Sequence, residues 1–596
     1  MPSTARQRNK GSKTERESEA APPPVKSSEL RRPAELGDFQ PWTPTAYTAF
    51  KALMSARLCA AIWSNISDCD ETFNYWEPTH FLLYGTGFQT WEYSPAYAIR
   101  SYAYLWIHAL PIKLYATALS ANKLLVLYFL RCILGFVCTL CEVYFYRGVC
   151  RHFGSNTGRL TLAFLIFSTG MFISCSAYLP SSFAMYMTLL AMAGWMYQHY
   201  QVSILAIAAS AILGWPFAGA IGIPIAFDIV FRRQKIGLFL KWCCISLLLF
   251  LVPSVLIDSH YYGKLVVASL NIVLYNVFSQ HGPDIYGVEP WTFYFINGFL
   301  DFNFVFLMAL ITLPFCLLVK HILKQSDRVL PLWLSTAPMY IWILIFFTRP
   351  HKEERFLFPI YPMFCVCGAV TLDHIQKLYS YLFTSRRARH YTELSNWLSA
   401  VVIILISLIS VSRTVALYQY YHAPMDMYVD ITRVSEDPSI HTLPADKDIN
   451  VCVGKEWYRF TSSFFLPSEK WHLQFIQSEF KGQLPKPYAS GPDATRIIPK
   501  NMNDMNREEP DRYVNISKCH YLIDLDLPRE TKLEPRYSQQ KNNWKVLTTT
   551  QFLDPSRSHK LFRAFFVPFV SSRYVTFVDY NLLQTKRTKK SSQRKP

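Results

Sequence analysis

Long apolar runs with few charged residues follow one another from about residue 46 to residue 415. Because a helix needs ~20 mostly apolar residues to cross a bilayer, we expect an α-helical multi-pass membrane protein with roughly eleven transmembrane helices. The run at 203–231 is broken at Gly214-Trp215-Pro216 and is long enough for two short or re-entrant helices. The runs lie at 49–66, 123–146, 160–178, 182–197, 203–231, 238–257, 293–318, 330–347, 356–372 and 397–412.

The composition narrows the class of protein. Apolar residues make up 51% of the chain and charged residues only 17%, compared with about 25% charged residues in ordinary soluble domains. An ordinary soluble enzyme is therefore disfavoured. A net charge of +18 could indicate a nucleic-acid partner, but the basic residues lie in the two tails and in short loops between apolar runs. That placement is typical of membrane topology, and we expect no nucleic-acid partner.

The basic loops also predict the orientation in the membrane. Clusters of Lys and Arg fall in alternate loops, which places them on the cytosolic side together with the N-terminal tail. The loops at 67–122, 258–291 and 349–355 and everything after about residue 415 then face the lumen. The cytosolic clusters are Arg147/Arg151/Arg159, Arg232/Arg233/Lys235, Lys320/Lys324/Arg328 and Arg386/Arg387/Arg389.

Four regions follow from these patterns. Residues 1–45 are rich in charge, Ser and Pro and predict a disordered cytosolic tail. No removable signal peptide is expected, so the first apolar helix serves as an uncleaved anchor. Residues 46–415 form the transmembrane domain with its luminal loops. Short alternating runs at 416–585 predict a small luminal α/β domain, and residues 586–596 are a basic tail.

Two features of the luminal side concern covalent chemistry. Asn515-Ile516-Ser517 is a glycosylation acceptor on the luminal domain, whereas Asn65-Ile66-Ser67 lies too close to its helix to be used. Cys452 and Cys519 could form a disulfide in an oxidising lumen. Most of the other cysteines lie within apolar runs without zinc-site spacing, and we interpret them as small core residues.

The densest polar cluster is the first luminal loop, where Asp68, Asp70, Glu71 and Glu77 follow a membrane helix. Carboxylates near a low-dielectric boundary have raised pKa values, which suits a general base that takes a proton from a sugar hydroxyl. The alternative is a solvated loop whose acids pair with nearby Arg residues.

A second cluster, His351-Lys352-Glu353-Glu354-Arg355, interrupts two apolar runs at the same luminal face. Ionisable residues at the membrane edge are functional candidates. His351, Lys352 and Arg355 could hold a phosphate, because Arg binds two oxygens as a fork and Lys adds a point charge. The alternative is a luminal hairpin with snorkelling side chains.

Aromatic residues with interspersed carboxylates supply two weaker candidates, the rim of Tyr93 with Arg100 and the stretch from Tyr286 to Trp291. Such residues can stack on sugars, but they equally form an interfacial aromatic belt. Asp68-x-Asp70 and Asp524-x-Asp526 have the metal-holding spacing of many nucleotide-sugar transferases. The pattern is weak, and the pair at Asp524 ends an apolar strand.

These motifs resemble a known family. Asp70-Glu71-Thr72-Phe73, Tyr93-Ser94-Pro95, Ile99-Arg100-Ser101-Tyr102, Tyr286-Gly287 with Pro290-Trp291, and His351-Lys352-Glu353-x-Arg355-Phe356 are similar to motifs of the dolichyl-phosphate-mannose-dependent mannosyltransferases of the GT-C superfamily, above all its α-1,2 group. Gly454 to Phe460 and Gln483-Leu484-Pro485-Lys486-Pro487 extend the likeness to the C-terminal region. Family members often have His-Pro where Asp68-Cys69 stands, so the role of Asp68 stays open.

The resemblance implies an inverting enzyme of the endoplasmic reticulum. It would transfer mannose from dolichyl phosphate mannose to a dolichyl-diphosphate-linked oligosaccharide on the luminal face, forming α-1,2 bonds. Asp70 would be the base and Glu71 would position it, with no cofactor and no catalytic metal. Substrate contacts would come from Tyr93, Arg100, Tyr286, Trp291, His351, Lys352, Glu353 and Arg355. The alternatives are a lipid or sugar transporter and a mannosyltransferase acting on glycosylphosphatidylinositol precursors.

Overall fold

The computed structural model describes residues 41–278, 283–324, 330–383, 390–442, 444 and 446–586. Most of the tail expected at 1–45 lies outside these ranges, as do residues 587–596 of the basic tail. Arg328, Arg386, Arg387 and Arg389 of the expected cytosolic clusters also lie outside the described residues.

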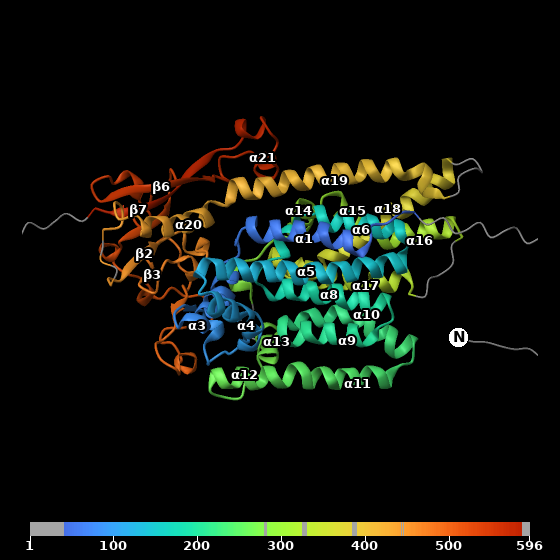
Figure 1. The fold of residues 1–596 in the computed structure, drawn as a ribbon, viewed down its shortest axis with the longest axis horizontal. Helices are drawn as coiled ribbons and strands as arrows, with labels where there is room; N and C mark the ends of the chain where they lie inside the picture. Colours follow the sequence, from blue (N-terminus) through green and yellow to red (C-terminus); the bar gives the residue numbers. More distant parts are fainter. Residues whose placement is uncertain are drawn as a thin grey trace, which may run out of the picture. The chain divides into compact units, whose positions relative to one another are not determined.

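Helices make up most of the described chain before residue 437, and the longest of them run side by side (Figure 1). α5 packs against α1 on one side and α8 on the other, and α18 packs against α6 and α15. The helices are α1 (Ala46–Trp63), α2 (Cys69–Glu71), α3 (Glu77–Tyr84), α4 (Tyr102–Leu119), α5 (Lys123–Phe153), α6 (Ser155–Phe167), α7 (Thr169–Ser174), α8 (Pro180–Met196), α9 (Tyr200–Ala209), α10 (Ile223–Phe227), α11 (Ile236–Ser246), α12 (Val252–Tyr262), α13 (Ala268–Phe278), α14 (Phe293–Phe302), α15 (Phe304–Leu310), α16 (Thr312–Ile322), α17 (Leu332–Phe347), α18 (Tyr361–Phe383), α19 (Tyr391–Tyr421) and α20 (Ala423–Glu436).

The chain is a helical multi-span membrane protein. By length and composition, four helical segments of the described residues can cross a membrane, and the pair α15 and α16, bent by 66°, adds a fifth if it counts as one span. Several predicted runs are divided into shorter helices, at Ser168 and, as expected, at Trp215. The count of roughly eleven spans stays a prediction. The four segments are Lys123–Phe153, Ile236–Tyr262, Glu354–Phe383 and Tyr391–Tyr421.

A mixed sheet forms in the C-terminal region, in agreement with the alternating runs found there. Its strand order is β3-β2-β5-β7-β6, with β2 parallel to β3 and β5, and β7 antiparallel to β5 and β6. The disulfide between Cys452 and Cys519 forms and joins β2 to the residues just before β5. The strands are β2 (Ile449–Val453), β3 (Trp471–Phe475), β5 (Tyr521–Leu525), β6 (Trp544–Leu553) and β7 (Phe577–Thr585), and the short helix α21 (Lys560–Ala564) lies between β6 and β7.

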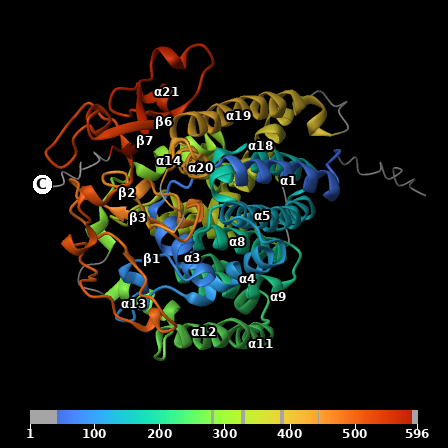
Figure 2. The ribbon, with the colours of Figure 1, turned by 60° about the vertical axis from the view of Figure 1, so that its left-hand side comes forward.

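A two-stranded pairing ties the loop after α1 to the C-terminal region. β1 (Phe88–Gln89) pairs antiparallel with β4 (Lys486–Pro487), and Figure 2 shows β1 beside α3, at the end of the helices where β2 and β3 lie. Fully buried Glu77 strengthens the link, since its carboxylate accepts hydrogen bonds from the Ser463 backbone N–H at 2.6 Å and from the Phe88 N–H at 3.2 Å. Segments almost 400 residues apart therefore share one wall.

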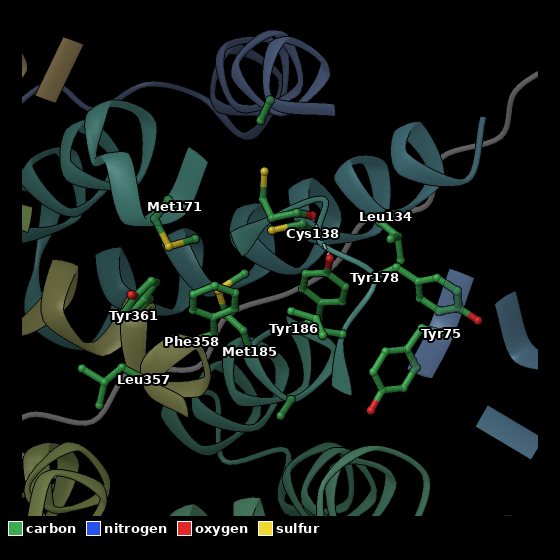
Figure 3. Close-up of a cluster of buried hydrophobic side chains, with 14 of the residues drawn as sticks. Tyr75, Leu134, Cys138, Met171, Tyr178, Met185, Tyr186, Leu357, Phe358 and Tyr361 are labelled. Carbon is green, nitrogen blue, oxygen red and sulfur yellow. Dashed lines mark hydrogen bonds between the residues drawn. The ribbon is translucent and has the colours of Figure 1, made fainter. Parts of the chain in front are cut away.

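The apolar core reaches from the helices to this wall. Figure 3 shows Tyr178 and Tyr186 between helices, with Tyr75 of the loop after α1 next to Tyr178. The ring centroids of Tyr75 and Tyr178 lie 5.8 Å apart, and the Tyr186 hydroxyl donates to the Cys175 carbonyl at 2.7 Å. Packing of this kind fixes the loop relative to the membrane helices.

One ion pair lies wholly inside the helical core. Arg57 of α1 donates to both carboxylate oxygens of Glu142 on α5, at 2.9 and 2.5 Å, and also to the Leu165 carbonyl at 2.7 Å. Both side chains are at most 1% exposed. Removing one partner of such a pair leaves an uncompensated buried charge, which costs about 3–5 kcal/mol.

We therefore expect Arg57→Ala and Glu142→Ala each to lower the unfolding temperature of the purified protein in detergent strongly. The double variant Arg57→Met/Glu142→Met should recover much of the loss, because no unpaired charge remains. Arg433→Ala, which removes an exposed pair with Asp430, should change the unfolding temperature little. Single variants as stable as Arg433→Ala would contradict a structural role for the pair.

Candidate functional site

A cavity of about 750 Å³ opens where the loops meet the C-terminal region. Its walls come from three parts of the chain: the loop after α1 (residues 64–101, the acidic loop), the loop before α18 (residues 348–356, the basic loop), and the C-terminal region. Trp215 and apolar side chains of two shorter helices, Ile272 of α13 and Phe346 of α17, line the rest. The cavity thus has an apolar part at these helices and a polar part at the loops and the C-terminal region.

Arg355 joins the two charged clusters of the sequence across the cavity. Its guanidinium contacts Asp70 at 2.5 Å and Asp68 at 3.2 Å from the acidic loop, and Glu353 at 2.5 Å from its own loop. Asp68 caps the short helix α2, accepting a hydrogen bond from the Asp70 backbone N–H at 2.9 Å. The acidic and basic clusters form one site.

The two aspartates differ in their protonation. Burial raises the pKa of Asp68 to about 7, since the opposing effect of Arg355 is the smaller one. Burial also acts on Asp70, but Arg355 and Arg100 outweigh it and hold the pKa of Asp70 below its ordinary value. Asp70 is therefore ionised at neutral pH and able to accept a proton.

Arg100 forms a second cationic group on the same wall. It donates to both oxygens of Glu92, at 3.0 and 2.9 Å, and to the Tyr75 hydroxyl at 2.6 Å. The bidentate geometry holds the guanidinium in place. Arg100 and Tyr286 both line the cavity.

Lys352 and His351 are held by partners in their own loop and in the segment before α14. Lys352 is buried, and its ammonium donates to the carbonyls of Glu289, at 2.9 Å, and of Arg349. His351 lies between the Gly287 carbonyl at 2.8 Å and the Glu353 carboxylate at 2.9 Å. Burial lowers the pKa of His351, but these two acceptors outweigh it and raise the value. His351 therefore tends toward its charged form beside the cavity.

Three predicted residues lie off the cavity wall. Buried Glu71 accepts hydrogen bonds from the Trp76 indole and from the Tyr178 N–H, both at 3.0 Å. The Tyr93 hydroxyl donates to the Asn74 carbonyl at 2.7 Å, and Trp291 is largely exposed. Glu71 and Tyr93 thus hold the acidic loop in shape from behind.

Arg349 is the cavity cation that the sequence reasoning missed. Among the residues that the structure describes, its side chain forms no ion pair, whereas Arg355 and Arg100 are both paired. Its place just before the His351 motif was the available signal. The sequence also did not predict that the C-terminal region lines the cavity, although Trp457 and Gln483 of this wall lie in motifs shared with the family.

The two Asp-x-Asp pairs have different surroundings. One ligand atom each from Asp68, Cys69 and Asp70 lies within 4.8 Å of the others, but the Arg355 guanidinium already bridges both carboxylates. Asp524 pairs with Lys455 at 3.0 Å, and Asp526 with Arg536 at 2.6 Å. Cations of the chain itself therefore neutralise both pairs.

Comparison with known proteins agrees with the motifs. The model of the Alg9-like mannosyltransferase family matches residues 48–467. The chain is 59% identical to the Mus musculus protein named "Alpha-1,2-mannosyltransferase ALG9", over 93% of this chain and 91% of that protein. It is 56% identical to the Homo sapiens protein of the same name, over 98% of both. The crystal structure of ArnT from Cupriavidus metallidurans bound to undecaprenyl phosphate is 12% identical, with a TM-score of 0.47 over 72% of this chain and 85% of that one. The resemblance drawn from the sequence is thereby confirmed, and the chain belongs to the Alg9-like mannosyltransferase family.

Proposed function

We propose that this chain takes mannose from dolichyl phosphate mannose and transfers it, with inversion, to a mannose of the lipid-linked oligosaccharide at the luminal face of the endoplasmic reticulum. The chain is an α-1,2-mannosyltransferase of lipid-linked oligosaccharide assembly. The observation that carries the donor and the mechanism is the bridge from Arg355 to Asp68 and Asp70, at the rim of a cavity with an apolar side.

The cavity fits a lipid-bound donor at one side and a sugar acceptor at the other. Ile272 of α13 and Phe346 of α17 lie on the apolar side, where the first units of the dolichyl chain would be buried. Trp457, Gln483 and Asn506 of the C-terminal region lie on the polar side. An aromatic ring and two amides suit a sugar, because the ring stacks on its apolar face and the amides bond its hydroxyls.

The transfer follows from the placement of the charged groups. An acceptor hydroxyl attacks C1 of the β-linked mannose from the face opposite the phosphate, and the new oxygen–carbon bond is α-linked. The bond between C1 and the phosphate oxygen breaks, and its electron pair leaves with dolichyl phosphate. Asp70 takes the hydroxyl proton, and the base role is consistent with its ionised state in the resting site.

Cations of the basic loop would stabilise the departing phosphate. Arg355 is already shared among three carboxylates and Lys352 is engaged with carbonyls, so we assign the main phosphate contact to Arg349, with His351 beside it. An arginine meets phosphate oxygens as a fork. These fixed charges do the work that a divalent ion does for a nucleotide diphosphate, and we propose that the reaction needs no metal.

The topology of this proposal keeps the boundaries drawn from the sequence. Residues 46–415 form the transmembrane catalytic domain with roughly eleven spans, and residues 416–585 form the luminal domain, preceded and followed by the two polar tails. Asn515 is exposed and would carry a glycan. Asn65 is half-buried, and its amide donates to the Leu417 carbonyl at 3.1 Å.

Asn515→Gln should therefore abolish the mobility shift that endoglycosidase H causes in protein from microsomes. Asn65→Gln should leave that shift unchanged and serves as the matched control. A shift that persists in Asn515→Gln would place the C-terminal region on the other side of the membrane or the glycan at another residue.

Asp70→Asn should lower turnover by about 10²- to 10⁴-fold while donor binding persists, because the amide keeps the shape but cannot take the proton. Glu71→Gln keeps an acceptor for Trp76 and Tyr178, so we expect its main effect on thermal stability. Turnover of each purified variant with labelled dolichyl phosphate mannose checks both expectations. If Asp70→Asn keeps near-normal turnover while a stable Glu71→Gln loses it, then Glu71 is the base and Asp70 the positioning residue.

The pH dependence separates Asp70 from Asp68 as the base. A base with a lowered pKa loses its charge only when the pH falls below the ordinary range of an aspartate, whereas Asp68 loses its charge as the pH falls through about 7. We expect kcat/KM to hold from pH 8 to below pH 6. The acidic limb of kcat should lie at higher pH than that of kcat/KM, because the negative charge of the bound donor phosphate raises the pKa of nearby Asp70. If kcat/KM instead falls as the pH drops through about 7, and this fall is absent in Asp68→Asn, then Asp68 rather than Asp70 is the base.

Arg349→Gln should reduce kcat/KM for dolichyl phosphate mannose by about 10²-fold, because the variant loses the guanidinium that stabilises the charge developing on the phosphate. Lys352→Ala should instead destabilise the basic loop, because its ammonium links backbone carbonyls. Arg529→Gln removes the same charge from an exposed position of the C-terminal region and should be neutral. Normal donor kinetics in Arg349→Gln would return the phosphate contact to Lys352 and Arg355.

A further inference from the structure

The segment between β6 and β7 is strongly basic and aromatic. No acidic residue occurs between Asp554 and Asp579, whereas Lys560, Arg563 and Arg573 are cationic. Six aromatic rings lie in the same stretch. They belong to Phe562, Phe565, Phe566, Phe569, Tyr574 and Phe577. Basic and aromatic side chains together are typical of proteins at the boundary between lipid and water.

This segment is attached to α19 at one point along that helix, around Ser412 and Arg413. The Phe566 N–H donates to the Ser412 carbonyl of α19 at 3.1 Å, and the Ser412 hydroxyl donates to the Phe566 carbonyl at 2.8 Å. The Arg413 guanidinium donates to the Ala564 carbonyl at 3.2 Å. Figure 1 shows α21 beside α19, toward the end of that helix which leads to the sheet.

The charge pattern of α19 indicates how deep in the membrane this attachment point lies. α19 is uncharged from Leu394 to Ser412, and Arg413 is the first charge after that stretch. Such a stretch is about as long as the ~20 residues that cross the hydrocarbon core. Arg413 therefore marks the edge of the core, and the segment is attached at that edge.

The side chains at the tip of the segment are apolar and exposed. Phe569 is 92% exposed, and Leu561, Val567, Val570 and Tyr574 are also exposed. On α19 just before the attachment point, Leu408 and Val411 are exposed as well, so the apolar surface of the tip continues that of the membrane helix. In water such a patch would be unfavourable.

Several backbone N–H groups of the tip are satisfied within the turn itself. The Val567 N–H donates to the Ser571 hydroxyl at 2.8 Å, and the N–H groups of Val570 and Ser571 donate to the Val567 carbonyl at 3.2 and 3.0 Å. Lipid offers no hydrogen bonds to free backbone groups. A turn closed in this way can enter the boundary region at little cost.

We propose that residues 560–574 are an interfacial membrane anchor, which dips its apolar tip into the lipid leaflet on the sheet side of the membrane. Lys560, Arg563 and Arg573 then face the headgroup phosphates. The anchor holds the sheet down on the membrane beside α19. Such an anchor requires that α19 crosses the bilayer, and it does not depend on the proposed reaction.

Lipid fits this surface better than a second copy of the chain does. Two copies meeting through the same patch would bring their three cations together without any acidic residue in the segment to compensate. Headgroup phosphates supply the opposite charge, and the acyl chains cover the apolar tip. The continuity with the lipid-facing side of α19 also favours a bilayer.

The test is photo-crosslinking of the full-length protein in nanodiscs of phosphatidylcholine and phosphatidylinositol. The photoreactive p-benzoylphenylalanine replaces Phe569, whose exposure makes the exchange tolerable. Leu408 on α19 is the positive control. The matched negative control is Val546, an exposed apolar residue of the same sheet, seven positions from the α19 end of β6 and so about 23 Å along the strand.

We expect phospholipid adducts at positions 569 and 408, and at least tenfold less adduct at 546. In the unmodified protein, trypsin should cleave after Arg529 but not after Arg573 while the nanodisc is intact. Four results would each overturn the anchor. Two concern lipid: an adduct at 408 without one at 569, or equal adducts at 569 and 546. The others are a crosslink from 569 to a second copy and rapid cleavage after Arg573.

Discussion

The site depends on one guanidinium held between two loops that lie 285 residues apart. Arg355 sits at the start of the segment that continues into α18, and it meets Asp68 and Asp70 where α1 has just ended. Without this cation, two carboxylates would face each other in a poorly solvated place, which costs several kcal/mol. With it, Asp70 is ionised and fixed in position. The same contact fixes the position of Asp70 relative to the cations of the basic loop.

The C-terminal region completes this arrangement. β1 and β4 pair, buried Glu77 bonds Ser463, and Thr72 donates to the carbonyls of Phe460 and Thr461 at 3.1 Å. These three links clamp the acidic loop against the C-terminal region. In the mechanism we propose, these links would hold the wall that contacts the acceptor sugar in a fixed position relative to the loop that carries Asp70.

Much of this was predictable from the sequence, and the remainder has identifiable physical reasons. The broken run at Trp215, the mixed sheet and the family follow from local patterns. The Cys452–Cys519 disulfide was only one possibility in the sequence, because pairing depends on the distance between the two residues in space. The meeting of Asp70 with Arg355 required a long-range contact, which periodicity does not encode. Lys352 shows the converse, since the ammonium of a lysine in a basic motif can be fully engaged by nearby backbone carbonyls. Whether a charge is free for substrate depends on its neighbours in space.

We propose that fixed cations of the chain neutralise the leaving phosphate of a lipid donor. The most direct measurement is turnover of the purified protein with labelled dolichyl phosphate mannose and a defined lipid-linked oligosaccharide, with and without EDTA, beside GDP-mannose as the donor. We predict full turnover in EDTA with the lipid donor and no turnover with GDP-mannose. Loss of turnover in EDTA that manganese restores, or turnover with GDP-mannose in the absence of lipid donor, would contradict the claim.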